Sequence, residues 1–291
     1  MELSKSEHLK LLRGQYRIKL IFIVPLITAI FAWIMGGYMG YQYMTLYWWY
    51  AFLLPGAIAI LCSLSHRKEE NAGKYYSVFS MPVNLSRFEF AKGIILVEKL
   101  LVSAIFLALL ISISNIIAPA TAVYSLLHSI TGSIGIILAS VWQIPLCLYL
   151  ARKTGMFVPI VLNTILGIVL STATALGNTV AWWFVPYCWA AKLAEPLMGI
   201  EMNGTYAGNC GFSIAIMISI SLSILLFLIL SYADAKNFPK GGRQKWVLFM
   251  CFVLNRKNEA YIVLGYSFLC TRYGGIVISC LLFPVCQHRR Q

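Results

Sequence analysis

Residues 65–93 read SHRKEENAGKYYSVFSMPVNLSRFEFAKG and lie between the second and third long apolar runs of the chain. The segment begins with charged residues and continues with aromatic ones. Pro82 is expected to end a helix, because the residue before a proline avoids the α region. Ser86 and Glu89 have the spacing of a capping box, which starts a new helix. The sequence therefore predicts that the chain leaves an apolar environment as a helix, passes through a short amphipathic turn and returns as a helix.

The composition is that of an integral membrane protein. The chain has 291 residues, of which 60% are hydrophobic and 11% are charged. A soluble domain with so few charges could not cover its surface with polar groups. Several runs reach the roughly 18 to 20 apolar residues that cross a hydrocarbon core. Residues 1–17 are polar and no small-residue cleavage site follows the first run, so we expect that run to act as its own signal-anchor.

The hydrophobic pattern predicts an all-α integral membrane protein with six spanning helices. An amphipathic helix over 1–19 is expected to lie in the cytoplasmic interface, although an ordinary solvated lead-in helix would have the same pattern. The six-span domain is expected to cover 20–232. Its spans are expected at 20–36, 46–64, 94–117, 126–150, 157–176 and 212–232.

Lysine and arginine residues are distributed by membrane side. Five lie in 1–19, five in 65–93, two at 152–153 and four in 233–245, whereas the three links on the opposite side contain only Lys192. Because positive charge concentrates on the cytoplasmic side, both ends of the six-span domain are expected in the cytoplasm. The net charge of +13 is thereby explained by topology, and no nucleic-acid partner is expected.

Small residues and prolines predict irregular points inside the spans. Pro55, followed by glycine, should kink or loosen the second span, which neighbouring helices can tolerate. Gly132, Gly135 and Ala139 form a small-residue surface suited to close helix packing in the fourth span. Pro145 should disturb the end of the same span.

Two adjacent charges, Glu98 and Lys99, fall inside the third span. Intramembrane charges are costly and are often functional. Lys99 can extend its ammonium back to the cytoplasmic surface, because helical side chains point toward the N-terminus. Glu98 is expected to pair with a basic residue on another helix.

Residues 177–211 are too interrupted for a simple span. Tryptophans and prolines alternate there with small polar residues. We expect a re-entrant or interfacial segment with its aromatic side chains at headgroup depth. Cys188 and Cys210 share this segment and could form a disulfide, but unpaired apolar cysteines are the favoured interpretation.

Residues 233–291 form a basic and then apolar, cysteine-rich tail that does not fit the six-span scheme. A span over 260–286 would place Arg272 near its middle, at a cost of roughly 2.5 to 3.5 kcal/mol. We expect a tail that does not span, or one that does not belong to the parent fold. The eight cysteines of the chain form no CxxC pair, so no metal site is expected.

The sequence contains no recognisable catalytic motif. It lacks the phosphate-binding GxxxxGK[ST] loop, the GxGxxG dinucleotide motif, HExxH and GxSxG. The chain is therefore not expected to be an enzyme. Six spans without a nucleotide-binding loop suggest a subunit that obtains its energy from another protein.

The 65–93 segment resembles the first cytoplasmic loop of ABC-2 type permeases. The similarity consists of Glu69-Glu70-x-x-Gly73, then Phe79-Ser80-Met81-Pro82-Val83, then Arg87 and Lys92. In that family this loop holds the coupling helix that docks on the ATPase. The N-terminal stretch and the length are more specifically similar to lantibiotic-protection permeases, which give immunity to the producing cell. The resemblance covers about residues 1–245.

The resemblance implies a permease subunit in a bacterial cytoplasmic membrane, surrounded by lipid and paired with a second, similar permease and a dimeric ABC ATPase. ATP and Mg²⁺ would bind to the ATPase, and this chain would bind no cofactor directly. The cargo would be a lantibiotic, a cationic antimicrobial peptide. The residues expected to couple to the ATPase are Glu69, Glu70, Gly73, Lys74, Tyr75, Tyr76, Phe79, Met81, Pro82, Arg87 and Glu89.

A peptide cargo suggests a contact site on the outer side. We hypothesise that Glu195 and Glu201, with Trp182 and Trp183, meet a cationic amphipathic peptide at the outer leaflet. An interfacial anchor with solvated carboxylates is the simpler alternative. Two other functions also fit the sequence: an ABC-2 permease that exports a different drug, a lipid or a polysaccharide, and a membrane receptor or anchor that transports nothing.

Overall fold

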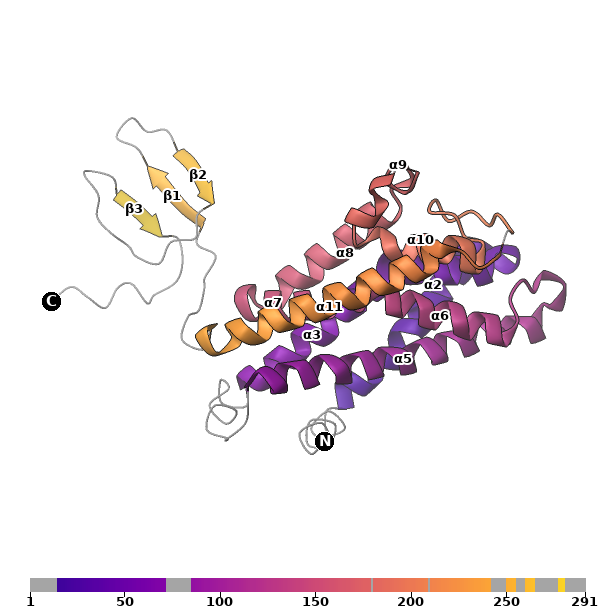
Figure 1. Cartoon of the computed structure of the whole chain (residues 1–291), viewed down its shortest axis with the longest axis horizontal. Helices are drawn as coiled ribbons and strands as arrows, with labels where there is room; N and C mark the ends of the chain where they lie inside the picture. Colours follow the sequence, from indigo (N-terminus) through magenta and orange to yellow (C-terminus); the bar gives the residue numbers. More distant parts are fainter. Residues whose placement is uncertain are drawn as a thin grey trace. The chain divides into compact units, whose positions relative to one another are not determined.

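The computed structural model describes the backbone of residues 15–71, 85–178, 180–208, 210–241, 250–254, 260–264 and 277–280. Side chains are described over 19–71, 88–174, 177–178, 182–208 and 210–236. The chain divides into two compact units, Met1–Gly242 and Arg243–Gln291. The first unit is helical and the second contains strands (Figure 1).

The helical unit is built from long helices joined by short turns. In chain order its elements are α2 (Gln15–Trp48), η1 (Trp49–Leu53), α3 (Leu54–Asn71), α5 (Leu85–Ile117), η2 (Pro119–Thr121), α6 (Leu126–Ser140), α7 (Gln143–Thr154), α8 (Phe157–Ser171), α9 (Thr174–Gly177), η3 (Val180–Phe184), α10 (Cys188–Met198) and α11 (Ile214–Gly241). The expected all-α fold is confirmed for this unit.

The long helix α2 reverses direction at Gly37. This glycine has a left-handed φ of 54°, which a side chain would disfavour. The rings of Phe31 and Trp48 lie 4.9 Å apart, although residues so far apart in sequence would be separated by about 25 Å along a straight helix. Lys19–Asn71 therefore folds as two antiparallel arms. This bend lies between the spans predicted at 20–36 and 46–64, and residues 38–45 continue as helix.

A π-helical turn precedes the proline of the second arm. This turn is η1, and it ends two residues before Pro55. Pro55 has no N–H to donate, so the regular hydrogen-bond ladder cannot continue through it. The predicted irregularity at this proline is confirmed. A Cβ placed on Gly167 would lie 2.8 Å from Pro55 Cγ, so α8 approaches this point at very short range.

The fourth predicted span is broken in two. α6 and α7 meet at an angle of 47°, and Pro145 lies in the first turn of α7, as the sequence predicts. Gly132 and Gly135 provide the expected close packing. A Cβ on Gly132 would collide with Met198 of α10, and one on Gly135 would press on Leu193 and Leu197 of the same helix.

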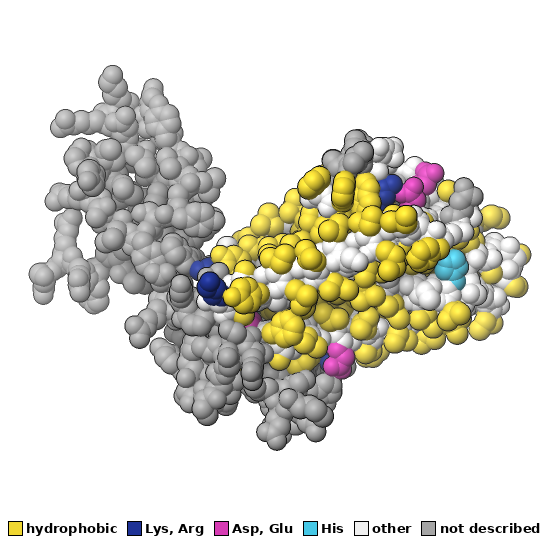
Figure 2. Space-filling model, viewed as in Figure 1, with side chains coloured by type: hydrophobic (Ala, Val, Ile, Leu, Met, Phe, Trp, Pro, Cys, Tyr) yellow, Lys and Arg dark blue, Asp and Glu magenta, His cyan; other side chains and the backbone are white. Residues whose placement is uncertain are grey.

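Helix α5 runs along one edge of the unit in Figure 1 and contacts α2, α6 and α11. Its buried residues Leu100, Leu107 and Ile111 belong to one apolar core that also includes side chains from α3, α7 and α10. Hydrophobic side chains also cover much of the outer surface in Figure 2. An apolar interior and an apolar exterior together are typical of a protein surrounded by lipid.

Within the described residues, three helical stretches are long and apolar enough to cross a membrane: Lys19–Asn71, Phe88–Ile117 and Ile214–Lys236. The bent pair α6 and α7 makes a fourth if it counts as one span. α8 is apolar but has only 15 residues. The count of six spans stays a prediction, and so does the side on which each end lies.

The second unit contains a small antiparallel sheet. Its strands are β1 (Met250–Leu254), β2 (Ala260–Leu264) and β3 (Val277–Cys280), in the order β2-β1-β3. β1 pairs in register with both neighbours, for example Phe252 with Ile262 and with Ser279. The strands are rich in β-branched and aromatic residues, which favour extended structure. The sequence left this tail without an assigned fold, and the all-α expectation does not extend to it.

The contact between α8 and Pro55 gives a test of the fold. Gly167→Val should lower the thermal stability of the purified protein by about 1–3 kcal/mol, because its side chain would overlap the Pro55 ring and the Ala51 carbonyl. Gly211→Val is the matched control, since nothing lies within 4 Å of a Cβ at Gly211. Thermal unfolding in detergent measures both. Equal stability of the two variants would contradict the described packing.

Candidate functional site

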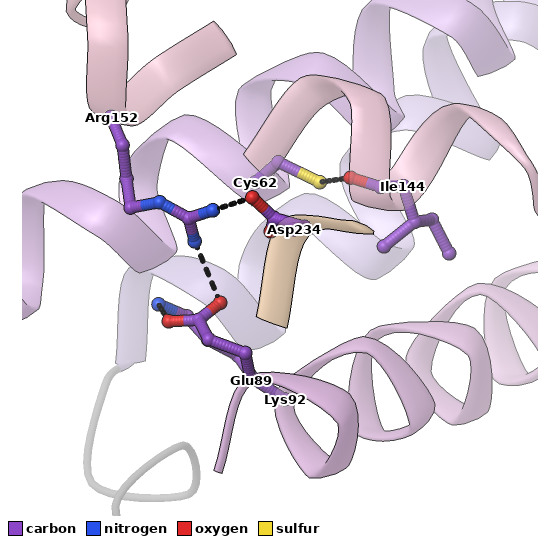
Figure 3. Close-up of polar contacts among 6 residues, drawn as sticks. All are labelled: Cys62, Glu89, Lys92, Ile144, Arg152 and Asp234. Carbon is purple, nitrogen blue, oxygen red and sulfur yellow. Dashed lines mark hydrogen bonds and ion pairs between the residues drawn. The ribbon is translucent and has the colours of Figure 1, made fainter. Parts of the chain in front are cut away.

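Four charged side chains meet inside one end of the helical unit. We call Glu89, Lys92, Arg152 and Asp234 the ion cluster (Figure 3). Glu89 and Lys92 come from the beginning of α5, Arg152 from the last turn of α7 and Asp234 from the last third of α11. The cluster therefore joins three helices that are far apart in the sequence.

Arg152 is the central residue of the cluster. Its Nη1 donates to Glu89 Oε2 at 2.8 Å, and its Nη2 donates to Asp234 Oδ1. The planar guanidinium fork suits two carboxylates held at fixed positions, which a lysine could not reproduce. Lys92 Nζ lies 4.0 Å from the other Glu89 oxygen. Two acidic and two basic groups make the cluster formally neutral.

The cluster is buried. Glu89, Lys92 and Asp234 are 4%, 2% and 5% exposed, and the side chain of Arg152 is 14% exposed. Charges withdrawn from water lose several kcal/mol of solvation each, so they persist only when they are paired. Removing one partner from such a set typically costs about 3–5 kcal/mol. The ends of α5, α7 and α11 are consequently held together by ion pairs. Breaking any one of these pairs would lower the stability of the fold by a large amount.

Local sequence explains where these residues lie. Gly155 ends α7 with a left-handed φ of 86°, and its N–H donates to Ala151 O. Arg152 therefore sits in the last turn of α7, where the helix dipole favours a cation. Glu89 lies in the second turn of α5, past the first turn to which the dipole effect is largely confined. The end of α7 is thus suited to the cation that it carries.

Helix α3 is attached to the same end of the unit. Cys62 Sγ donates to Ile144 O of α7 at 3.6 Å, close to the cluster in Figure 3. Ser63 Oγ donates to Met156 O at 3.3 Å. Glu69 is buried near the end of α3. Both helices that flank the 65–93 segment, α3 and α5, are therefore tied to α7 close to the cluster.

Most of the predicted coupling residues lie outside the described residues. These are Gly73, Lys74, Tyr75, Tyr76, Phe79, Met81 and Pro82. Arg87 belongs to α5, and its side chain is also outside the description. Glu70, in the last turn of α3, lies 3.7 Å from His66 Nε2. Of the predicted coupling residues, Glu89 is the member that the structure places in the ion cluster.

The partnership of Arg152, Asp234 and Lys92 was not predicted from the sequence. Arg152 and Lys92 had indicated membrane side, and Lys92 also contributed to the family resemblance. Asp234 is the one acidic residue in the basic stretch 233–245, and that isolation was the available signal. An acidic residue at a cytoplasmic boundary that otherwise carries cations favours a buried ion pair.

Glu98 and Lys99, the two charges expected inside the third span, contact each other. Lys99 Nζ donates to Glu98 Oε1 at 3.2 Å, and the Glu98 side chain is half exposed. Glu98 thus forms an ion pair with its neighbour in the sequence, Lys99. Pairing with a basic residue on another helix stays a prediction.

The predicted outer contact residues have separate local partners. Lys192 Nζ donates to Glu195 Oε2 at 2.6 Å. Glu201 accepts from the hydroxyl of Thr205 and from Asn203 within its own turn. Trp182 is partly buried against the core, and Trp183 is 45% exposed. The contacts described for these side chains do not assemble them into a single site.

The opposite end of the unit is closed by neutral hydrogen bonds. Tyr124 OH donates to Met198 O at 2.6 Å, and His128 Nε2 lies 2.7 Å from Leu197 O. The turn before α6 and the first part of α6 thus supply partners for the last carbonyls of α10. Burial raises the pKa of the Tyr124 hydroxyl, which keeps it a donor. Gln42 accepts from the N–H groups of Val123 and Tyr124 at 2.7 and 2.9 Å.

Cys188 and Cys210 are free thiols. The possible disulfide between them is therefore not formed, and the interpretation as unpaired cysteines is confirmed. Burial raises the pKa of Cys188 to about 11, so the thiol is protonated at neutral pH and is a poor nucleophile. Among the described side chains, no group of three or more His, Cys, Asp or Glu residues could hold a metal ion.

Comparison with known proteins gives one match. A family model described as "ABC-2 family transporter protein" matches residues 3–170, which is more than half of the chain. The matched region includes the 65–93 segment, Glu89 and Arg152. No curated protein and no solved structure matches the chain at a significant level.

The cluster gives a second testable prediction. Arg152→Met should lower stability by about 3–5 kcal/mol, because Glu89 and Asp234 would stay buried without their shared cation. Arg67→Met is the control: Arg67 is exposed and its described contact is a weak one, with the Met156 sulfur at 3.9 Å. Its effect should be within about 0.5 kcal/mol.

A combined variant separates lost pairing from lost packing. Adding Glu89→Gln, Lys92→Met and Asp234→Asn to Arg152→Met removes all four charges and should recover most of the lost stability. Thermal unfolding in detergent measures the single and the combined variants. An Arg152→Met protein as stable as the parent would show that the cluster does not hold these helices together.

Proposed function

Because the chain belongs to the ABC-2 family of transporter proteins, we propose that it is a permease subunit driven by a separate ABC ATPase. The family match carries this proposal. The apolar helices make the chain a multi-pass membrane protein. The ATPase would bind ATP and Mg²⁺, and this chain would supply the path through the membrane and the surface on which the ATPase acts.

The 65–93 segment is the proposed docking site for the ATPase. The segment offers aromatic surface at Tyr75, Tyr76 and Phe79 and charge at Glu70 and Lys74. It is much longer than a connection between neighbouring helices requires. Charged and aromatic side chains in one segment suit a surface that must bind a soluble partner and release it.

The ion cluster is the proposed joint between the docking site and the rest of the permease. α3 leads into the 65–93 segment and α5 leads out of it, and both are tied to α7. Arg152 of α7 also pairs with Asp234 and so ties α11 to the same point. A force on the segment would therefore move these four helix ends as one body. Rigid-body motion of packed helices is an established way to convert a partner's movement into a change of access.

For the cargo we propose a lantibiotic or a similar cationic amphipathic peptide, removed from the producer's own cytoplasmic membrane. Support comes from the resemblance to lantibiotic-protection permeases and from the charge distribution. The end of the unit that is predicted to face outward carries Glu195 and Glu201 against the single cation Lys192. A second, similar permease would complete the path.

The docking proposal has a direct test. The chain, intact or with 69–82 replaced by a Gly/Ser linker, is purified from its native host in a mild detergent. A nucleotide-binding subunit should accompany the intact chain only. Glu70→Ala and Phe79→Ala should each release it, and Glu98→Ala, a change outside the segment, should retain it. If no such subunit accompanies the folded intact chain, the protein works without an ATPase, as a receptor or anchor would.

The cargo proposal is tested with the outer carboxylates. Glu195→Gln together with Glu201→Gln should reduce protection against the cationic peptide at least several-fold with unchanged expression. The Glu195 side chain is 43% exposed, and a glutamine in its place can still accept a hydrogen bond from Lys192, so the fold should persist. Lys192→Gln is the control and should keep protection. Unchanged protection in the double variant would favour a different drug, a lipid or a polysaccharide as cargo.

A further inference from the structure

A groove runs between α5 and α11 on the outside of the helical unit. Its volume is about 410 Å³, within the range of roughly 300–1,000 Å³ that small-ligand sites occupy. The side chains that line it include Phe90 and Ile94 of α5 and Leu228, Ser231, Tyr232 and Ala235 of α11. The groove is therefore mostly apolar, with two hydroxyl groups on the α11 side.

The two helices are in close contact beneath the groove. Gly93 presents no side chain to α11, and a Cβ at that position would lie 3.5 Å from the ring of Phe227. The Phe227 ring also lies 6.2 Å from that of Phe90. The groove consequently has a closed floor, and a ligand can reach it only from outside the helical unit, where lipid surrounds a membrane protein.

The position of the groove along the helices corresponds to a membrane boundary. Its lining residue Phe90 follows Glu89 directly, and Ala235 follows Asp234 directly. The groove and the ion cluster thus occupy the same turns of α5 and α11 on different faces. Ile94 and Leu228 extend the groove about one turn toward the apolar interior of the membrane.

A lysine follows the lining of the groove on α11. Lys236 comes directly after the lining residue Ala235 and is exposed. Tyr232 is 72% exposed one turn earlier on α11, and aromatic rings with a hydroxyl are typical of the headgroup region. A lysine at this depth attracts the negative headgroups of anionic lipids. An apolar groove that can hold an acyl chain therefore adjoins an exposed lysine that can contact a negative charge.

We propose that this groove binds one anionic phospholipid, with an acyl chain along Ile94 and Leu228 and the phosphate at Lys236. A free phosphate would leave the apolar slot empty, and an uncharged lipid would gain nothing from the lysine. The bound lipid would cover the seam between α5 and α11 directly outside the ion cluster. This inference is independent of the cargo and of the ATPase.

The test is a count of retained lipids. The full chain is reconstituted in vesicles of phosphatidylcholine and phosphatidylglycerol in equal parts, extracted in mild detergent and examined by native mass spectrometry. The parent should retain one phosphatidylglycerol in preference to phosphatidylcholine. Lys236→Gln should lower that preference by about fivefold, the attraction expected from one lysine near an anionic surface. Lys68→Gln, at the end of α3, should leave the preference unchanged.

A second variant tests the apolar part of the site. Leu228→Trp fills the groove and should abolish retention of either lipid. Leu228 is half exposed, so the larger ring can occupy the open groove on the outer surface without disturbing the helix packing beneath it. The thermal stability should therefore stay unchanged. Three outcomes would each overturn the proposal. The parent could retain no lipid, Lys236→Gln and Lys68→Gln could have equal effects, or the chain could form lipid-free dimers. The last outcome would show that a second copy covers the groove.

Discussion

The architecture of the helical unit depends on the attraction of one buried arginine for two carboxylates on different helices. Arg152 on α7 holds Glu89 at the beginning of α5 and Asp234 near the end of α11. In a protein whose outer surface faces lipid, apolar contacts give little preference for one arrangement of helices over another, because lipid chains are as apolar as side chains. Buried charges have no such alternative partners, so they fix which helix ends meet.

The two ends of the unit are held by different kinds of interaction. The cluster end is ionic and adjoins the segment that we propose as the ATPase docking site. The other end is held by neutral hydrogen bonds, among them those of Gln42, Tyr124 and His128. A further neutral centre lies deeper, where Asn163 donates to Pro55 O at 2.7 Å and accepts from Tyr187 OH. An ionic joint that is costly to break suits the end that receives the force. Neutral bonds, each worth about 1 kcal/mol, suit an end that must open.

Much of the helical framework could be predicted from the sequence, because hydropathy and proline act locally. The apolar runs, the irregularity at Pro55 and the break before Pro145 all follow from single helices. The turn between the first two spans was predicted only to within 37–45, because no charged residue marks its position, and the structure places the bend at Gly37. The cluster could not be predicted, since the pairing of Arg152 with Asp234 depends on how α7 packs against α11. The strands of the tail were missed because a cysteine-rich apolar stretch has no clear period.

The central claim is that the ion cluster transmits the movement of the ATPase, and one measurement tests it directly. The charge-free variant Glu89→Gln/Lys92→Met/Arg152→Met/Asp234→Asn is assembled with the partner subunits in vesicles, and ATP hydrolysis and cargo transport are measured on the same sample. With the fold and the ATPase attachment intact, the account predicts that hydrolysis continues while transport falls at least tenfold. Transport that keeps pace with hydrolysis in this variant would contradict the account and would leave the cluster only a stabilising role.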